Sequence, residues 1–436
     1  MGFFRNVAFV LATSAAALPI SLATGVVLAR WLSVADRGLY ALLTTFSAIV
    51  FLLTQLGWGD AIIYRTRRHS VSPRKAFATG LIANGAFALA AFALCLVFRE
   101  PLSRGFLGDV SPRAFWIAAA TAPLLTIGDL LRGVARALDR FDLHNQFGLL
   151  QSGLILVALV IALPLAGGAL EAALVANLLV QAALVASFGA RVAALAGFEW
   201  RVDLPEALAS IAYGGVMYLQ NLLVNLHERV DVFLLAALGV AASDIGLYAA
   251  AVSVVAPLRL IPGALGTVLL PRLAGASESD AAAFTAAVVR PSILLMLIAA
   301  LALAGAGALG IPLLFGRDYA PAVVPFLVLL PGVTAVTVSR VLARYFAAVG
   351  RQRALVVLLA AALLLNVALN YVLIPRAGIV GAALASLISY SLEAVAMTAL
   401  FVVESGQGLR ATLIPNASDF EGYAARLREI VSARPR

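Results

Sequence analysis

Long runs of hydrophobic residues alternate with short polar stretches along most of the chain. Twelve runs are long enough to cross a bilayer as α-helices, which takes about 20 residues each. They lie at 6–29, 39–63, 76–98, 114–137, 146–166, 169–190, 211–238, 245–270, 284–308, 322–346, 354–374 and 379–403. The pattern predicts an all-α polytopic membrane protein with twelve transmembrane helices.

One of these runs, 211–238, is amphipathic. At about 100° per residue its polar side chains fall on one broad face, and the opposite face is apolar. Ionisable groups are costly in hydrocarbon, so they normally face the interior of a helix bundle or a water-filled cavity. We therefore expect this helix to wall a central cavity with Gln220, Asn221, Asn225, His227, Glu228, Arg229 and Asp231.

Composition and charge agree with a membrane protein. The chain is 63% hydrophobic and 12% charged, whereas soluble domains are about 25% charged. Of its 31 lysines and arginines, 22 fall on one side of the predicted membrane and seven on the other. This positive-inside asymmetry predicts a multi-pass membrane protein with both termini in the cytoplasm. The net charge of +9 thus reflects topology and does not indicate a nucleic-acid partner.

Residue counts exclude several kinds of chemistry. Cys95 is the only cysteine, so neither a disulfide nor a cysteine metal site can form within the chain. The three histidines, His69, His144 and His227, show no metal-ligand spacing. Lys75 is the only lysine and precedes Ala76, which rules out a Walker A phosphate loop for ATP. We expect no metal and no cofactor, with H⁺ or Na⁺ as candidate coupling ions.

Two halves of the sequence align at a constant offset of 208 residues. The matches are Asp36–Ala41 with Asp244–Ala249, Gly108 with Gly316, and Pro123, Thr126, Arg132 and Arg136 with Pro331, Thr334, Arg340 and Arg344. Six plus six helices in parallel orientation predict two bundles around a central cavity, and alternating access by rocking of the halves. The predicted domains are an N-terminal bundle (1–198), a cytoplasmic linker (199–206), a C-terminal bundle (207–403) and a cytoplasmic tail (404–436).

With these motifs in place, the chain resembles a known family. The Asp-x-Gly-Leu-Tyr repeat, Gln55-Leu56-Gly57 with Arg65, and Arg229-Val230-Asp231 are similar to the polysaccharide-exporter branch of the multidrug/oligosaccharidyl-lipid/polysaccharide flippase superfamily, which includes Wzx-type O-antigen flippases. The resemblance covers about 1–403. It implies a flippase of the cell inner membrane, not an enzyme, that moves undecaprenyl-diphosphate-linked oligosaccharide from the cytoplasmic to the periplasmic leaflet for polysaccharide biosynthesis. Its partners would be that lipid, membrane lipids and other polysaccharide assembly proteins.

An anionic diphosphate that crosses the hydrocarbon region needs cations and hydrogen-bond donors. The candidate ligands are Arg229 and Arg259 within the membrane and Arg30 at an outer helix end, with Gln220, Asn221 and Asn225 on the polar face. Each arginine has a structural alternative: a salt bridge within or to 211–238 for Arg229 and Arg259, and contact with lipid headgroups for Arg30.

Two further groups carry candidate roles. Asp231 and Glu228 could bind a coupling ion, or could only neutralise nearby arginines. Arg132 and Arg136, repeated as Arg340 and Arg344, could receive the diphosphate at the cytoplasmic entrance or could serve as topological anchors. Asn366, Asn370 and Glu393 form another polar group, for which helix–helix hydrogen bonding is the simpler role.

Two other functions fit parts of the sequence. A cation-coupled multidrug exporter of the same superfamily would use Glu228 and Asp231, although the first predicted helix has no evident acidic residue. A membrane polysaccharide polymerase fits less well, because the predicted outer loops are short and no loop carries an Asp-x-Asp metal pair.

Overall fold

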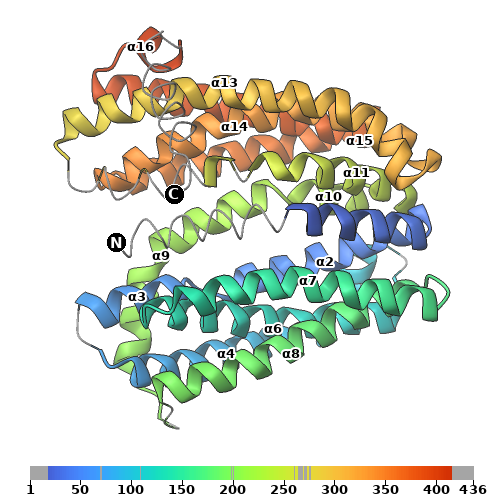
Figure 1. Cartoon of the computed structure of the whole chain (residues 1–436), viewed down its shortest axis with the longest axis horizontal. Helices are drawn as coiled ribbons and strands as arrows, with labels where there is room; N and C mark the ends of the chain where they lie inside the picture. The colour runs from blue at the N-terminus through green and yellow to red at the C-terminus, as the bar shows by residue number, and fades with distance from the viewer. Residues whose placement is uncertain are drawn as a thin grey trace, which may run out of the picture.

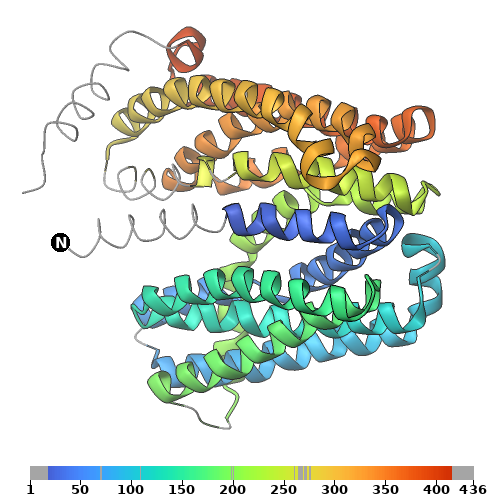
Figure 2. The ribbon, with the colours of Figure 1, turned by 45° about the vertical axis from the view of Figure 1, so that its right-hand side comes forward.

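The computed structural model describes residues 18–414 apart from 69–70, 109, 198, 200, 260, 264–268, 270–272 and 274–275. The chain forms two helical bundles that lie side by side (Figures 1 and 2), the first from α2 to α8 and the second from α11 to α16, while α9 crosses between them. The start of the first predicted helix and most of the predicted tail lie outside the described residues.

The bounds of the helices follow the hydrophobic runs closely. In the first bundle they are α2 (Val34–Thr54), α3 (Trp58–Arg68), α4 (Pro73–Val97), α5 (Arg99–Leu102), η1 (Ser103–Leu107), α6 (Pro112–Ala137), α7 (Phe141–Leu165) and α8 (Leu170–Ala196). The remainder are α9 (Leu204–His227), α10 (Val230–Ala237), α11 (Ala242–Val255), η2 (Ala256–Arg259), α13 (Glu278–Gly310), η3 (Ile311–Phe315), η4 (Arg317–Ala322), α14 (Val323–Ala348), α15 (Gln352–Ser405) and α16 (Leu409–Leu413).

Within the described residues, nine helices are long and apolar enough to span a membrane, and a bent pair within α9 makes a tenth. The long element α15 contains two of the predicted spans, because Gly378 has non-helical dihedral angles. The chain reverses there: Arg351, just before α15, forms an ion pair with Glu404 at its far end. Together with the shorter helix Leu18–Trp31, these elements correspond to the predicted segments, and the all-α membrane fold is confirmed.

The internal repeat is visible in the element boundaries. Helix α2 begins at Val34 and α11 begins at Ala242, which preserves the offset of 208 residues. The π-helical turns η1 and η3, which begin at Ser103 and Ile311, preserve it as well. The sequence repeat therefore encodes two structurally equivalent halves.

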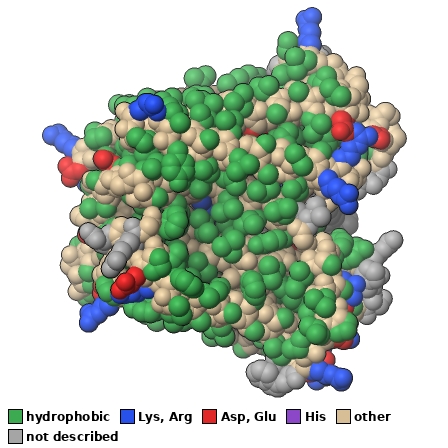
Figure 3. All heavy atoms as spheres, turned by 180° about the vertical axis from the view of Figure 1, so that it is seen from behind, with side chains coloured by type: hydrophobic (Ala, Val, Ile, Leu, Met, Phe, Trp, Pro, Cys, Tyr) green, Lys and Arg blue, Asp and Glu red, His purple; other side chains and the backbone are tan. Residues whose placement is uncertain are grey.

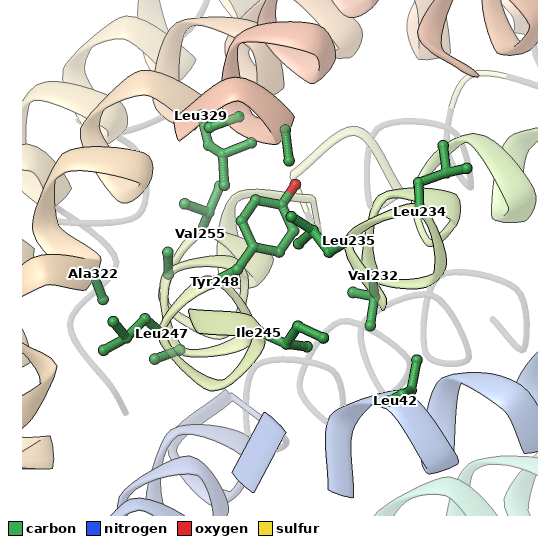
Figure 4. Close-up of a cluster of buried hydrophobic side chains, with 14 of the residues drawn as sticks. Leu42, Val232, Leu234, Leu235, Ile245, Leu247, Tyr248, Val255, Ala322 and Leu329 are labelled. Atoms are coloured by element: carbon green, nitrogen blue, oxygen red, sulfur yellow. The ribbon is translucent and has the colours of Figure 1, made fainter. Parts of the chain in front are cut away.

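Hydrophobic packing differs between the two ends of the molecule. At the end that the predicted topology assigns to the periplasm, here called the outer end, one buried cluster joins both bundles. Figure 4 shows its centre, where Tyr248 lies among leucines and valines of α10 and α11, with Leu42 from α2 and Leu329 from α14 nearby. At the opposite, inner end, each bundle has a separate cluster, around Phe147 in the first and Tyr345 in the second. The halves are thus fused at the outer end and separate at the inner end.

The molecular surface is that of a membrane protein. In the view of Figure 3, hydrophobic side chains cover the middle of the molecule and charged side chains gather towards its two ends. Large apolar residues such as Leu165 and Val403 are more than four-fifths exposed. Exposed apolar surface on this scale is stable where lipid chains cover it.

Candidate functional site

A cavity of about 790 Å³ lies between the two bundles at the inner end, within the range of about 300–1,000 Å³ that is usual for ligand sites. Helices α3, α6, α9, α14 and α15 all contribute to its wall. The polar lining residues are Asp60, Tyr64, Arg136, Tyr213, Gln220, Asn221, Ser339, Arg340, Arg344 and Glu393. Three arginines face two carboxylates, so the lining is cationic overall.

The cavity lies beside interruptions in two membrane helices. The second predicted span breaks at Gln55–Gly57, where Leu56 and Gly57 adopt left-handed φ angles of 46° and 72°. The seventh span breaks between α9 and α10, around Glu228 and Arg229. Irregular backbone at membrane depth is tolerated where it is buried in protein or lines a water-filled space, and discontinuous helices mark substrate sites in many transporters.

Helix α9 belongs to both bundles because it bends by 54° between Gly215 and Met217. Before the bend, Arg65 of α3 donates two hydrogen bonds to Glu206, at 2.8 and 2.5 Å. After the bend, Gln220 donates to the Gln352 carbonyl oxygen of the second bundle (3.1 Å). The expectation of one continuous polar face over 211–238 was wrong, because the helix breaks between His227 and Val230. Gln220 and Asn221 line the cavity before the break, and Asp231 is buried after it.

The linker before α9 is fixed to the first bundle. Lys75 forms an ion pair of 2.5 Å with Asp203, and Asp203 caps α9 by accepting a hydrogen bond from the Glu206 backbone N–H (2.8 Å). The hydrogen bond from Lys75 holds the pKa of the Asp203 carboxyl below its usual range. The carboxylate is therefore ionised at neutral pH, which suits the positive end of the α9 dipole.

The arginines of the second bundle fall into paired and unpaired groups. Glu228 lies between two guanidinium groups, 3.2 Å from Arg340 and 3.2 Å from Arg259. Arg344 is exposed towards the cavity and makes no side-chain hydrogen bond or ion pair with a described residue. Of the predicted entrance residues, Arg136, Arg340 and Arg344 line the cavity, whereas Arg132 pairs with Asp129 at 3.1 Å outside its lining.

The other predicted ligands occupy varied positions. Gln220 and Asn221 line the cavity, whereas Asn225 bonds to the Asn221 carbonyl oxygen one turn away (2.8 Å). Arg229 is exposed at the helix break, and Arg259 pairs with Glu228. In this conformation neither arginine lies among the described residues of the lining, so their roles as ligands stay predictions.

A polar network is buried inside the second bundle. Asp231 is 3% exposed and accepts hydrogen bonds from Tyr248 (2.7 Å), Asn370 (2.9 Å) and Ser386. These donors come from α11 and from both arms of α15, so the carboxyl group ties three helices together. Asn370 also bonds to Asn366 one turn away in the same helix, while its bond to Asp231 of α10 is of the expected helix–helix kind.

A buried imidazole connects this network to the cavity. His227 Nε2 lies 3.0 Å from Ser389 Oγ, and His227 Nδ1 lies 3.2 Å from Glu393 Oε2. Asn366 donates to the same Ser389 hydroxyl (3.2 Å), which links the two groups. Because Glu393 lines the cavity, a continuous polar path runs from the cavity wall to the region of Asp231.

The outer end is closed by close packing of the two repeats. A Cβ atom on Gly38 of α2 would lie 1.9 Å from the Ala242 carbonyl oxygen, and one on Gly246 of α11 would lie 2.1 Å from the Val34 carbonyl oxygen. Only glycine permits this approach. The repeated Gly of the Asp-x-Gly-Leu-Tyr motif is thus the contact point between the halves.

Two arginines reinforce the closure. Arg37, 4% exposed, places its guanidinium 4.7 Å from the centre of the Phe315 ring and 5.1 Å from that of Tyr319. Arg30 donates to the carbonyl oxygens of Leu314 (2.7 Å) and Leu313 (2.6 Å). Arg30 therefore bonds across the seam between the bundles in this conformation, a role that its position at a helix end did not indicate.

The sequence did not point to four polar lining residues, Asp60, Tyr64, Tyr213 and Ser339. The two tyrosine rings stack with their centres 3.6 Å apart, and they join α3 to α9. Asp60 accepts a hydrogen bond from Arg136 (3.3 Å). The signal for α3 was the sequence Leu56-Gly57-Trp58-Gly59, because two closely spaced glycines within a hydrophobic run indicate a helix break.

Comparisons with known proteins agree with this architecture. The family model described as "Polysaccharide biosynthesis protein" matches residues 27–324. No curated protein sequence gives a match. Among solved structures, a multidrug resistance MATE family transporter of the MOP superfamily, in an inward-facing conformation, has a TM-score of 0.73 at 13% identity and covers 92% of this chain and 98% of its own.

Two further solved structures share the fold. The lipid II flippase MurJ, in an inward closed conformation, has a TM-score of 0.71 at 13% identity, over 98% of this chain and 93% of its own. A MATE transporter of Vibrio cholerae has a TM-score of 0.62 at 15% identity, over 93% and 97%. At such low identity these likenesses establish the fold alone, that of a multi-pass helical membrane protein.

Proposed function

This chain belongs to the polysaccharide biosynthesis protein family, and we propose that it is a flippase for undecaprenyl-diphosphate-linked oligosaccharides. It would move them from the cytoplasmic to the periplasmic leaflet of the inner membrane by alternating access, without catalysing a covalent reaction. The observation that carries the proposal is the cationic cavity, which separates the bundles at the inner end while Gly38 and Gly246 close the outer end.

The cavity has the chemistry that such a substrate requires. A lipid diphosphate needs cationic donors, and guanidinium groups match phosphate oxygens in a bidentate manner. Arg344, Arg340 and Arg136 supply them from both bundles, and Gln220 and Asn221 add uncharged donors. We assign the first contact with the diphosphate to Arg344, because its guanidinium has no partner among the described residues to give up.

Arg229 lies at the break between α9 and α10, and Arg259 is the last residue of η2. We propose that they meet the diphosphate after the halves have rocked, when the pairing of Glu228 with Arg340 and Arg259 changes. Arg30, which now bonds across the outer seam, would be released by the same motion. Glu228 then acts as the exchangeable counter-ion of these arginines.

We propose Asp231 as the coupling site for H⁺ or Na⁺. Its carboxyl group is buried among oxygen and amide groups from three helices, and oxygen ligands of this kind suit a hard cation. Glu228 is less suited, since two arginines already neutralise it. Asp231 lies in the first turn of α10, directly after the helix break. An ion bound to its carboxylate would therefore change the position of α10 relative to α9.

The alternative is a cation-coupled multidrug exporter, which the fold of the MATE relatives permits. Cationic drugs require an anionic or neutral cavity, whereas this lining carries three arginines against two carboxylates. A deletion strain of the source organism separates the two functions. We expect loss of a surface polysaccharide and accumulation of its lipid-linked precursor on the cytoplasmic side, both reversed by the wild-type gene. Normal polysaccharide with increased sensitivity to cationic dyes would favour the exporter.

A further inference from the structure

The cavity has a polar side pocket that the diphosphate does not explain. This pocket, here called the annex, has a volume of about 220 Å³, room for several water molecules. It lies at the break between α2 and α3, beside the part of α9 that carries Tyr218 and Asn221. Its lining side chains are Gln55, Asp60, Asp129, Arg136, Tyr218 and Asn221, and each of them carries a polar group. Asp60, Arg136 and Asn221 also line the main cavity, so the two spaces adjoin.

The annex differs from the main cavity in charge. Its lining has two carboxylates, Asp60 and Asp129, against one guanidinium, Arg136. Both carboxylates are ion-paired, Asp60 with Arg136 (3.3 Å) and Asp129 with Arg132 (3.1 Å). A diphosphate would therefore compete with these carboxylates for Arg136 and is better placed at Arg340 and Arg344 on the opposite wall. The charge distribution thus orients the substrate, with its anionic end towards the second bundle and its uncharged polar end towards the first.

Several hydrogen-bonding groups in the annex are uncommitted. The side-chain amides of Gln55 and Asn221 make no hydrogen bond with a described residue that would have to break on binding. The buried Nε of Arg136 has no hydrogen-bond partner among the described residues. Gly59 keeps the space open, because a Cβ atom there would approach Arg136 Nη2 and Asp129 Oδ2 to 3.3 Å.

We propose that the annex binds the first sugar of the lipid-linked glycan, and that it selects an uncharged sugar. This inference rests on the proposed flippase function. Carboxylates and amides accept and donate hydrogen bonds to ring hydroxyls, and the ring of Tyr218 offers a face for the apolar side of a sugar. An anionic sugar, such as a uronic acid, would meet the two carboxylates at close range and be disfavoured.

The test measures binding of three probes to the full-length protein in lipid nanodiscs: undecaprenyl diphosphate alone, the same lipid carrying one glucose, and the same lipid carrying one glucuronic acid. We expect the glucose lipid to bind roughly tenfold more tightly than the bare lipid, the result of one or two net hydrogen bonds. The glucuronic acid lipid should bind more weakly than the glucose lipid.

The variant Gln55→Met should remove much of the advantage of the glucose lipid and leave the affinity for the bare lipid unchanged. Gln407→Met, the same substitution outside both cavities, should alter neither, and thermal unfolding of each variant checks the fold. Equal affinity for the glucose and bare lipids, or an equal effect of Gln55→Met on both, would overturn the annex assignment and leave the flippase intact. Failure of all three probes to bind would overturn the proposed function and this inference with it.

Discussion

At the scale of single residues, the cost of burying charge explains which arginines are held in pairs and which are available. Arg259 and Arg340 both form ion pairs with Glu228. Removing one member of such a group would leave a buried charge on another without a counter-charge. Arg344 faces the cavity without a partner among the described residues. An unpaired guanidinium within a membrane protein is stable only beside water or an anion, and a cavity that receives a lipid diphosphate, as we propose, would supply both.

The first prediction concerns Arg344. Arg344→Gln keeps bulk and hydrogen bonding but removes the charge, so binding of undecaprenyl diphosphate should weaken roughly 10- to 100-fold, as for the loss of a charged hydrogen bond. Arg344→Lys should restore binding in part, because an ammonium lacks the planar bidentate fork. Binding to purified protein in nanodiscs measures both variants.

Arg351→Gln is the control for Arg344, since Arg351 pairs with Glu278 (2.9 Å) and Glu404 away from the cavity lining. It should leave lipid binding unchanged. Unaltered affinity in Arg344→Gln would remove Arg344 from the site. A loss in Arg259→Gln as large as that in Arg344→Gln would show that Arg259 also reaches the diphosphate.

At the scale of elements, hydropathy predicts where the helices lie but not where they break. The runs around 39–63 and 211–238 read as single spans, because a short break hardly changes average hydropathy. The separation of Asp231 from Gln220 and Asn221 depends on the break between α9, which ends at His227, and α10, which begins at Val230, and a constant 100° per residue cannot represent such a break. The repeat placed the entrance arginines on equivalent helices, α6 and α14. Arg136, Arg340 and Arg344 line the cavity as predicted, whereas Arg132 does not, because it pairs with Asp129.

The second prediction tests the seam between α2 and α11. Gly38→Ala should push the halves apart at the outer end, since its methyl group would overlap the Ala242 carbonyl oxygen. In a Cys95→Ser background, a cysteine at Thr44, which lines a pocket of about 320 Å³ beside the seam, should then react faster with a membrane-impermeant thiol reagent added from the periplasmic side. Gly105→Ala, with nothing near its Cβ position, should have no effect. Equal labelling rates with and without Gly38→Ala would mean that this contact does not hold the outer end closed.

The third prediction tests the coupling site on α10. Asp231→Asn preserves size, but it removes the charge that would bind H⁺ or Na⁺. In proteoliposomes, an imposed gradient of the coupling ion should accelerate lipid translocation by the wild-type protein and not by this variant. Asp244→Asn, at the exposed outer start of α11, should behave like the wild type. Stimulation of Asp231→Asn by the same gradient would place the coupling site elsewhere.

At the scale of the whole molecule, the arrangement of hydrophobic cores supports the proposed alternating-access mechanism. One core joins the bundles at the outer end, and separate cores leave the cavity between them at the inner end. The repeat with its offset of 208 residues already predicted two equivalent halves. Which end is closed depends on packing between the halves, at Gly38, Gly246 and Arg37, and pairwise packing of distant segments has no signature in local composition.

The central claim is that this cavity carries a lipid-linked glycan across the membrane, and translocation by purified protein tests it most directly. Proteoliposomes would contain undecaprenyl-diphosphate oligosaccharide, with a membrane-impermeant glycosidase outside to digest the glycan in the outer leaflet. Wild-type protein should make the protected inner-leaflet fraction digestible, Arg351→Gln should do the same, and Arg344→Gln should do so far more slowly. Digestion no greater than in protein-free liposomes, or equal rates for the wild type and Arg344→Gln, would contradict the account.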